Sequence, residues 1–163
     1  MRSAALTLSL LALAGAAQAH VTADPRATPA GAFQVVRFRV GHGCHDTAAT
    51  TRLRIEMPPG LSAARPQPKP GWTLSIERAA DGTARAVTWS GKLPADQFDE
   101  FAVYLRPPAM AGALYFPTVQ TCGREEEQWT EVPDPGEDGH ALRHPAPVLA
   151  LTPAGAPDDS HHH

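Results

Sequence analysis

Residues 52–57 read RLRIEM, and this stretch decides the fold class of the chain. Its apolar residues, Leu53, Ile55 and Met57, alternate with charged residues, which is the period of a β-strand with one buried face. Residues 58–60 read PPG and end the strand, because proline cannot donate to a ladder and glycine favours turns. We therefore expect a strand with an apolar face on a core and a charged face in solvent.

The same alternation recurs between turn residues along the chain, without a sustained helical period. Residues 33–40 read FQVVRFRV and predict a strand with a bulge at Val35-Val36, where the alternation slips. Asp81-Gly82 indicates the turn of a hairpin. Residues 62–71 and 123–141 are expected to be irregular. Further strands are expected within residues 20–24, 72–76, 87–89, 101–105, 114–120 and 148–151.

Composition supports the same fold class. The 17 prolines and 13 glycines are spread along 163 residues, so long helices are hard to place between them. The length fits one domain with a sizeable core. We expect an all-β fold, a single antiparallel β-sandwich that is Ig-like or cupredoxin-like in the broad sense. The net charge of −3 and the lack of a basic patch argue against nucleic acid as a partner.

Residues 1–19 have the three parts of a secretory signal peptide. Arg2 supplies the positive charge, residues 6–14 form a short apolar run, and Ala17-Gln18-Ala19 is a small-x-small cleavage site. The alternative is an uncut anchor, but the run is shorter than the roughly 20 residues that span a bilayer. We expect cleavage after Ala19, export to a bacterial periplasm, and no stable membrane anchor afterwards. The domain would then cover residues 20–152, and residues 153–163 would be a disordered tail.

Cleavage after Ala19 would make His20 the first residue of the mature protein. Its free amine and its imidazole Nδ1 can then chelate one metal ion, and this nitrogen donor set suits Cu(II). A carboxylate or water would complete the site. We name His20 and Glu56 as the metal ligands. The sequence also leaves open Asp24, Asp46, Glu127 and Glu131 as the carboxylate that completes the site.

The two cysteines, Cys44 and Cys122, predict a disulfide in an exported protein. It would close a loop of about 80 residues, worth roughly 4 kcal/mol in chain entropy. A cysteine-based metal site is the alternative. His42 and His45 flank Cys44 and could form a second metal site, although loop histidines are more often solvated. The terminal His161–His163 could collect metal or be a flexible remnant.

Several short motifs follow one another in a fixed order after residue 19. They are HVT at 20–22, GC at 43–44, Thr50, PKPGW at 68–72, WSG at 89–91, DEF at 99–101, YFPTVQTC at 115–122, WTEVP at 129–133 and PAP at 145–147. Each is weak alone, but together they resemble the YcnI-like family of copper-binding domains. The resemblance covers nearly all of the chain after the signal.

This resemblance implies a β-sandwich that binds Cu(II) through a single-histidine brace on His20, with Trp129 beside the copper. Trp129 follows the polar run Glu125–Gln128, a poor setting for a core strand, although a core position is the usual fate of tryptophan. Trp72 and Trp89 lie on alternating strands and are expected in the core.

We expect a non-enzymatic, periplasmic Cu(II)-binding protein that acts in copper trafficking or homeostasis, as a chaperone or a store. Its partners would be the copper ion and another periplasmic copper protein. One alternative is a metal-free structural or adhesive β-sandwich. The other is an oxidative copper enzyme, which needs a second histidine from His42, His45, His140 or His144. The sequence contains no Ser-His-Asp order, P-loop or dinucleotide fingerprint.

Overall fold

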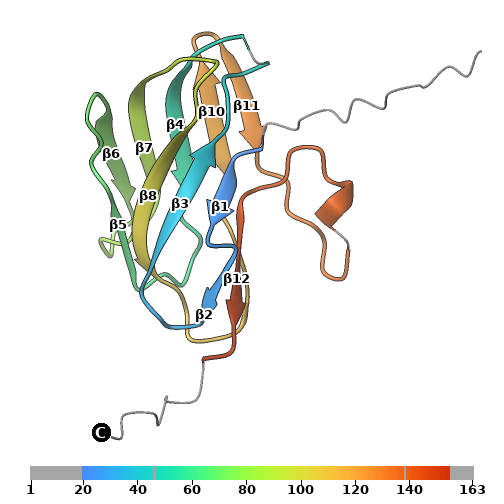
Figure 1. Cartoon of the computed structure of the whole chain (residues 1–163). Coiled ribbons are helices and arrows are strands. Elements are labelled where there is room, and N and C mark those ends of the chain that lie inside the picture. Colours follow the sequence, from blue (N-terminus) through green and yellow to red (C-terminus); the bar gives the residue numbers. More distant parts are fainter. Residues whose placement is uncertain (1–19, 46, 138, 155–163) are drawn as a thin grey trace, which may run out of the picture.

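The computed structural model describes residues 20–45, 47–137 and 139–154, whose strands form a β-sandwich (Figure 1). The expected signal peptide (1–19), Asp46 and the tail residues 155–163, with His161–His163, lie outside the described residues. The described residues contain no helix that is long and apolar enough to cross a membrane.

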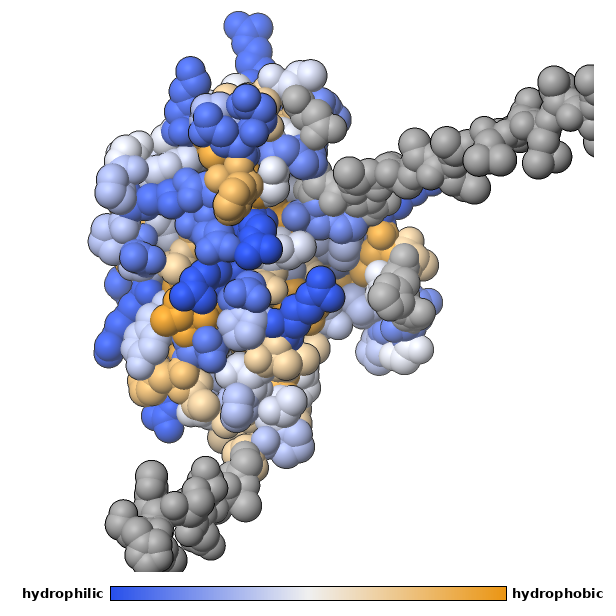
Figure 2. Space-filling view, in the orientation of Figure 1, coloured by the Kyte–Doolittle hydropathy of each residue, from blue (hydrophilic) through white to orange (hydrophobic). Residues whose placement is uncertain are grey.

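One layer is a four-stranded antiparallel sheet. Its order is β1 (Thr22–Asp24), β3 (Gln34–Val40), β8 (Asp99–Arg106) and β5 (Ala63–Pro66). Its outward side faces the viewer in Figure 1, and Figure 2 shows that face as mostly hydrophilic with small apolar areas. There Arg39 pairs with Glu100 at 2.7 Å, and the exposed rings of Phe33 and Tyr104 stack at 5.0 Å.

The other layer is a five-stranded antiparallel sheet. Its order is β11 (Glu125–Trp129), β10 (Thr118–Cys122), β4 (Thr50–Glu56), β7 (Ala84–Leu93) and β6 (Thr73–Arg78). A smaller sheet joins β2 (Ala27–Pro29), β12 (Val148–Thr152) and β9 (Gly112–Tyr115), with β2 and β12 parallel. A short 3-10 turn, η1 (Gly139–Ala141), precedes β12.

The core lies between the two larger sheets and follows the predicted alternation. Leu53, Ile55 and Met57 are buried, while the charged residues between them face outward. Trp89 of β7 is fully buried against Phe101 of β8, with ring centroids 5.4 Å apart. The predicted all-β sandwich is therefore confirmed.

The predicted hairpin turn is also present between β6 and β7. The Ala79 N–H donates to the carbonyl of Thr83 at 2.8 Å, closing the turn. Gly82 has a φ of +85°, a conformation that glycine adopts without the steric cost of a Cβ. Trp72 was expected in the core. Its side chain packs against the core but is only partly buried, so this prediction holds in part.

Two strand predictions were wrong in detail. β3 pairs with β8 in continuous register, so the slip at Val35-Val36 is not a bulge; Val35 is an apolar residue on the outer side of the sheet. The single strand predicted at residues 114–120 is divided into β9 and β10 around Pro117, which has no N–H to donate to a ladder.

Three other strands were missed. β2 follows the segment expected at residues 20–24, β5 lies in the proline-rich segment and β11 in the acidic segment, and all three are sheet edges. An edge strand has one unpaired side and tolerates proline and charge, so it lacks the apolar pattern of a central strand.

Candidate metal centre

His20 lies two residues before Thr22, the first residue of β1, which is an edge strand of the four-stranded sheet. Its imidazole packs edge-on against the indole of Trp129, with ring centroids 5.3 Å apart and an interplanar angle of 76°. This contact joins the β1 edge of one sheet to the β11 edge of the other. His20 Nε2 is buried and has no hydrogen-bond partner among the described residues. This atom is the ring nitrogen opposite to Nδ1, which would chelate a metal together with the terminal amine.

Trp129 is the last residue of β11, and its side chain points into the sandwich with 4% exposure. The polar run before Trp129 indicated a poor setting for a core strand, yet the structure buries this residue. The indole N–H donates to Oε1 of Gln120 at 3.3 Å. Gln120 is itself 1% exposed, and its amide donates to Thr50 Oγ1 at 2.7 Å and to the carbonyl of His42 at 2.9 Å. This network fixes the indole that contacts His20.

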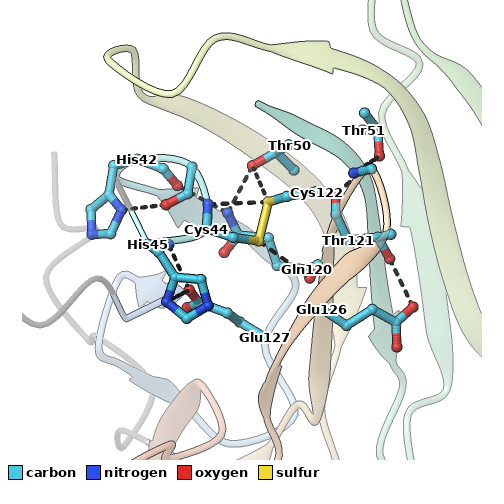
Figure 3. Close-up of a disulfide and its surroundings, with 12 residues drawn as sticks. His42, Cys44, His45, Thr50, Thr51, Gln120, Thr121, Cys122, Glu126 and Glu127 are labelled. Carbon is cyan, nitrogen blue, oxygen red and sulfur yellow. Dashed lines mark hydrogen bonds and ion pairs between the residues drawn. A yellow bond between two sulfur atoms is a disulfide. The ribbon is translucent and has the colours of Figure 1, made fainter. Parts of the chain in front are cut away.

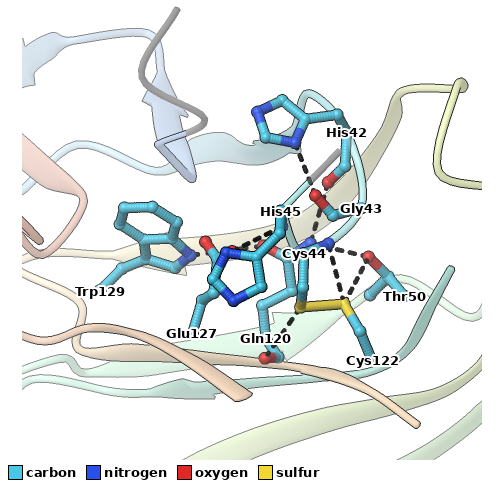
Figure 4. A network of polar contacts seen from close by, with 9 residues as sticks. All are labelled: His42, Gly43, Cys44, His45, Thr50, Gln120, Cys122, Glu127 and Trp129. Carbon is cyan, nitrogen blue, oxygen red and sulfur yellow. Dashed lines mark hydrogen bonds and ion pairs between the residues drawn. A yellow bond between two sulfur atoms is a disulfide. The ribbon is translucent and has the colours of Figure 1, made fainter. Parts of the chain in front are cut away.

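Glu127 lies two residues before Trp129, and side chains two apart on a strand share one side. It pairs directly with Gln120 across the β10–β11 ladder, and its side chain is only 13% exposed. Its Oε1 accepts a hydrogen bond from the backbone N–H of His45 at 3.0 Å, and the Nδ1 of the His45 ring lies 3.7 Å away (Figure 4). The structure thus places one largely buried carboxylate beside the tryptophan that contacts His20.

The other candidate carboxylates have different surroundings. Glu56 lies on the outer side of the five-stranded sheet, opposite to the side that faces Trp129, and pairs with Arg54 at 2.8 Å. Asp24 is exposed on the outer side of β1. Glu131 accepts the backbone N–H of His144 at 2.8 Å. The structure therefore does not bring Glu56 or Asp24 to the side chains around Trp129.

A second imidazole also contacts Trp129. The ring of His144 lies 5.4 Å from the indole, tilted by 47°, and its backbone is held by Glu131. In the sequence, His144 was a candidate ligand of an oxidative copper enzyme. Its contact with Trp129 depends on the return of residues 142–146 to the strand end, which no local pattern predicts.

The predicted disulfide between Cys44 and Cys122 is confirmed, with Cα atoms 5.9 Å apart (Figure 3). It ties the loop after β3 to the end of β10, and the Cys44 N–H donates to Cys122 Sγ at 3.1 Å. Gly43 packs so closely on the backbone of Ala48 that any side chain would collide with it. The loop that carries His42 and His45 is therefore tightly constrained.

Within the described residues, no three histidine, cysteine, aspartate or glutamate side chains gather as a metal cage. A brace on His20 does not require one, because one of its nitrogens is the terminal amine rather than a side chain. Asp46, Asp138, the side chain of His140 and the tail histidines lie outside the described part of the molecule.

Comparison with known proteins identifies the family. The model of the family described as "Domain of unknown function (DUF1775)" matches residues 20–151. The chain belongs to the DUF1775 family. This is the YcnI-like family that the sequence motifs resemble, so that prediction is confirmed.

Two relatives of this DUF1775 chain are informative. It is 28% identical over 120 residues to the "Copper-binding protein CutI" of Bacillus subtilis (strain 168). The match covers 68% of this chain and 57% of the relative, so this chain spans little more than half of that protein. A solved structure from Nocardia farcinica, described as an uncharacterized protein with an immunoglobulin-like fold, has a TM-score of 0.67 and 34% identity. The match covers 81% of this chain and 97% of the Nocardia farcinica chain, which supports the Ig-like fold class.

Proposed function

We propose that this protein is an exported Cu(II)-binding protein whose metal is held by a single-histidine brace on His20 after residues 1–19 are removed. The observation that carries the proposal is the contact of the His20 ring with Trp129, the tryptophan that the family resemblance implies beside the copper. The name of the Bacillus subtilis relative supports copper as the metal. The disulfide supports an oxidising compartment such as the periplasm.

The residues around His20 fit this metal. The amine and imidazole nitrogens suit divalent copper, which forms the strongest complexes with such donors among the common divalent metals. We propose Glu127, rather than Glu56, as the carboxylate that completes the site. Glu127 lies on the same side of β11 as Trp129 and is largely buried, whereas Glu56 faces solvent beside Arg54.

We propose that copper is the cargo of this protein and that its role is trafficking or storage rather than catalysis. Trp129 and the Gln120 network cover one side of the metal position with a fixed indole. Such cover limits the access of water and reductants to bound metal. The recipient or donor would be another periplasmic copper protein.

The test is a Cu(II) titration of the protein that begins at His20, followed by electron paramagnetic resonance. We expect one tight equivalent with nitrogen and oxygen ligands. Glu127→Gln should weaken binding by more than the roughly tenfold that loss of a ligand's hydrogen-bond partner costs. Glu56→Gln is the matched control and should bind as the parent does. Equal binding by both variants would exclude Glu127 as a ligand, and absence of a tight equivalent in the parent would exclude the function.

A further inference from the structure

We propose that His45 and Glu127 form a second, weaker Cu(II) site at the surface, through which the metal is loaded before it reaches His20. This inference rests on the proposed function and adds to it the route by which copper arrives. The two side chains come from segments far apart in sequence, the loop after β3 and the edge strand β11.

The spacing of the two donor atoms fits one metal ion. His45 Nδ1 and Glu127 Oε1 are 3.7 Å apart. When two ligand atoms each lie about 2.0 Å from one metal, they are about 2.8 Å apart if the angle at the metal is about 90°. They are about 4.0 Å apart if they lie on opposite sides of the metal. The observed separation falls within this interval, and an imidazole nitrogen with a carboxylate oxygen is a donor pair that Cu(II) accepts. Water would fill the other positions, which makes such a site weak and quickly exchanging.

The fold holds His45 in this position. Its φ is +49°, a left-handed conformation that is uncommon for a residue with a side chain and persists only where the surroundings enforce it. The surroundings here are the hydrogen bond from its backbone N–H to Glu127 and the disulfide at the preceding residue, Cys44. The ring is therefore placed beside the carboxylate by the backbone, while the side chain of His45 remains 71% exposed.

The pair leads from solvent to the proposed copper position. Exposure falls from His45 through Glu127 to Trp129, and Trp129 contacts His20. Figure 4 shows His45, Glu127 and Trp129 close together. Because Glu127 is shared by both positions, copper can exchange one ligand at a time and keep its carboxylate.

The matched variants are His45→Ala and His42→Ala. His42 lies in the same loop, but its Nδ1 is directed at the carbonyl of Gly43, at 2.6 Å (Figure 4). Cu(II) is supplied as its bis-glycine complex to the protein that begins at His20, and loading is followed by stopped-flow tryptophan fluorescence. We expect His45→Ala to slow loading severalfold, while the final electron paramagnetic resonance spectrum and the Cu(II) affinity stay unchanged. His42→Ala should load copper at the rate of the parent protein. Equal rates for His45→Ala and the parent, or equal slowing by both variants, would overturn the proposal.

A second measurement separates this proposal from the brace. Acetylation of the His20 amine removes the terminal chelate and leaves the surface pair intact. The acetylated protein should bind one weak Cu(II) with a single imidazole nitrogen in its electron paramagnetic resonance spectrum, and the additional change His45→Ala should abolish it. If the parent lacks a tight site but the acetylated protein keeps the weak one, the brace fails and the His45 site stands. If the weak signal survives His45→Ala, the His45 site fails whatever the brace does.

Discussion

Replacement of Trp129 by phenylalanine separates its two roles, because Trp129 is both a core residue and the neighbour of His20. Phenylalanine has no indole N–H, so Oε1 of the buried Gln120 loses its donor, at a cost of about 1–3 kcal/mol. The smaller ring also leaves space in the core, which brings the expected loss of stability to about 2–4 kcal/mol. For a domain of this size the melting temperature should fall by roughly 6–12 °C. The fold should survive.

The functional effect of Trp129→Phe is expected in fluorescence. Cu(II) at His20 should quench the adjacent indole of the parent protein and leave the more distant tryptophans less affected. Trp129→Phe should lose this quenching and still bind copper, because the His20 nitrogens remain. Trp89→Phe is the control: it also removes a buried indole that donates a hydrogen bond, to the Gln67 carbonyl at 3.0 Å. Trp89 lies on β7, three strands or roughly 14 Å from β11. Quenching that persists in Trp129→Phe, or disappears in Trp89→Phe, would refute the reasoning.

Three further changes test the scaffold. Replacing both half-cystines by alanine should lower the free energy of unfolding by about 4.5 kcal/mol, measured by urea denaturation, because the disulfide closes a loop with a sequence separation of 78. Hydrogen bonds from the Arg54 guanidinium hold the pKa of Glu77 below its ordinary 4.5. Its contribution to stability is therefore complete above about pH 4.5 and lost as pH falls through the lower folded value, so Glu77→Gln should reduce the fall in melting temperature between about pH 5 and pH 3. Gly91→Ala should cost about 1–3 kcal/mol in thermal unfolding, because its methyl group would collide with the Trp72 ring. An unchanged unfolding free energy, pH dependence or melting temperature would contradict the respective expectation.

The sequence predicted the central strands well, because they are buried on one face and solvated on the other. Leu53 and Ile55 show this period, and the structure buries both. The same rule failed at Val35, an apolar residue on an outer face, and at the edge strands β5 and β11, where pairing on one side leaves composition less constrained. Alternation of apolar and polar residues reflects the burial of one face of a strand. This alternation is therefore less regular in edge strands, and such strands are harder to predict.

The site was predictable only in part. His20 follows from the signal peptide and its chemistry, and the association with Trp129 came from the family resemblance rather than from any local pattern. Glu127 was one of five open carboxylates, but its position two residues before Trp129 could have favoured it once β11 was recognised as a strand. The position of His45 depends on a left-handed backbone and a long-range disulfide, and neither its conformation nor its contact with Glu127 has a signature in the local sequence.

The most direct test of the brace compares two forms of the protein that begins at His20. One keeps its free terminal amine, and in the other this amine is acetylated. Mass spectrometry establishes each terminus, and Cu(II) affinity is measured by competition with a chelator of known strength. Because an acetylated amine can no longer chelate the metal together with the His20 imidazole, we predict tight binding in the first form and its loss in the second. Equal tight binding by both forms would contradict the single-histidine brace.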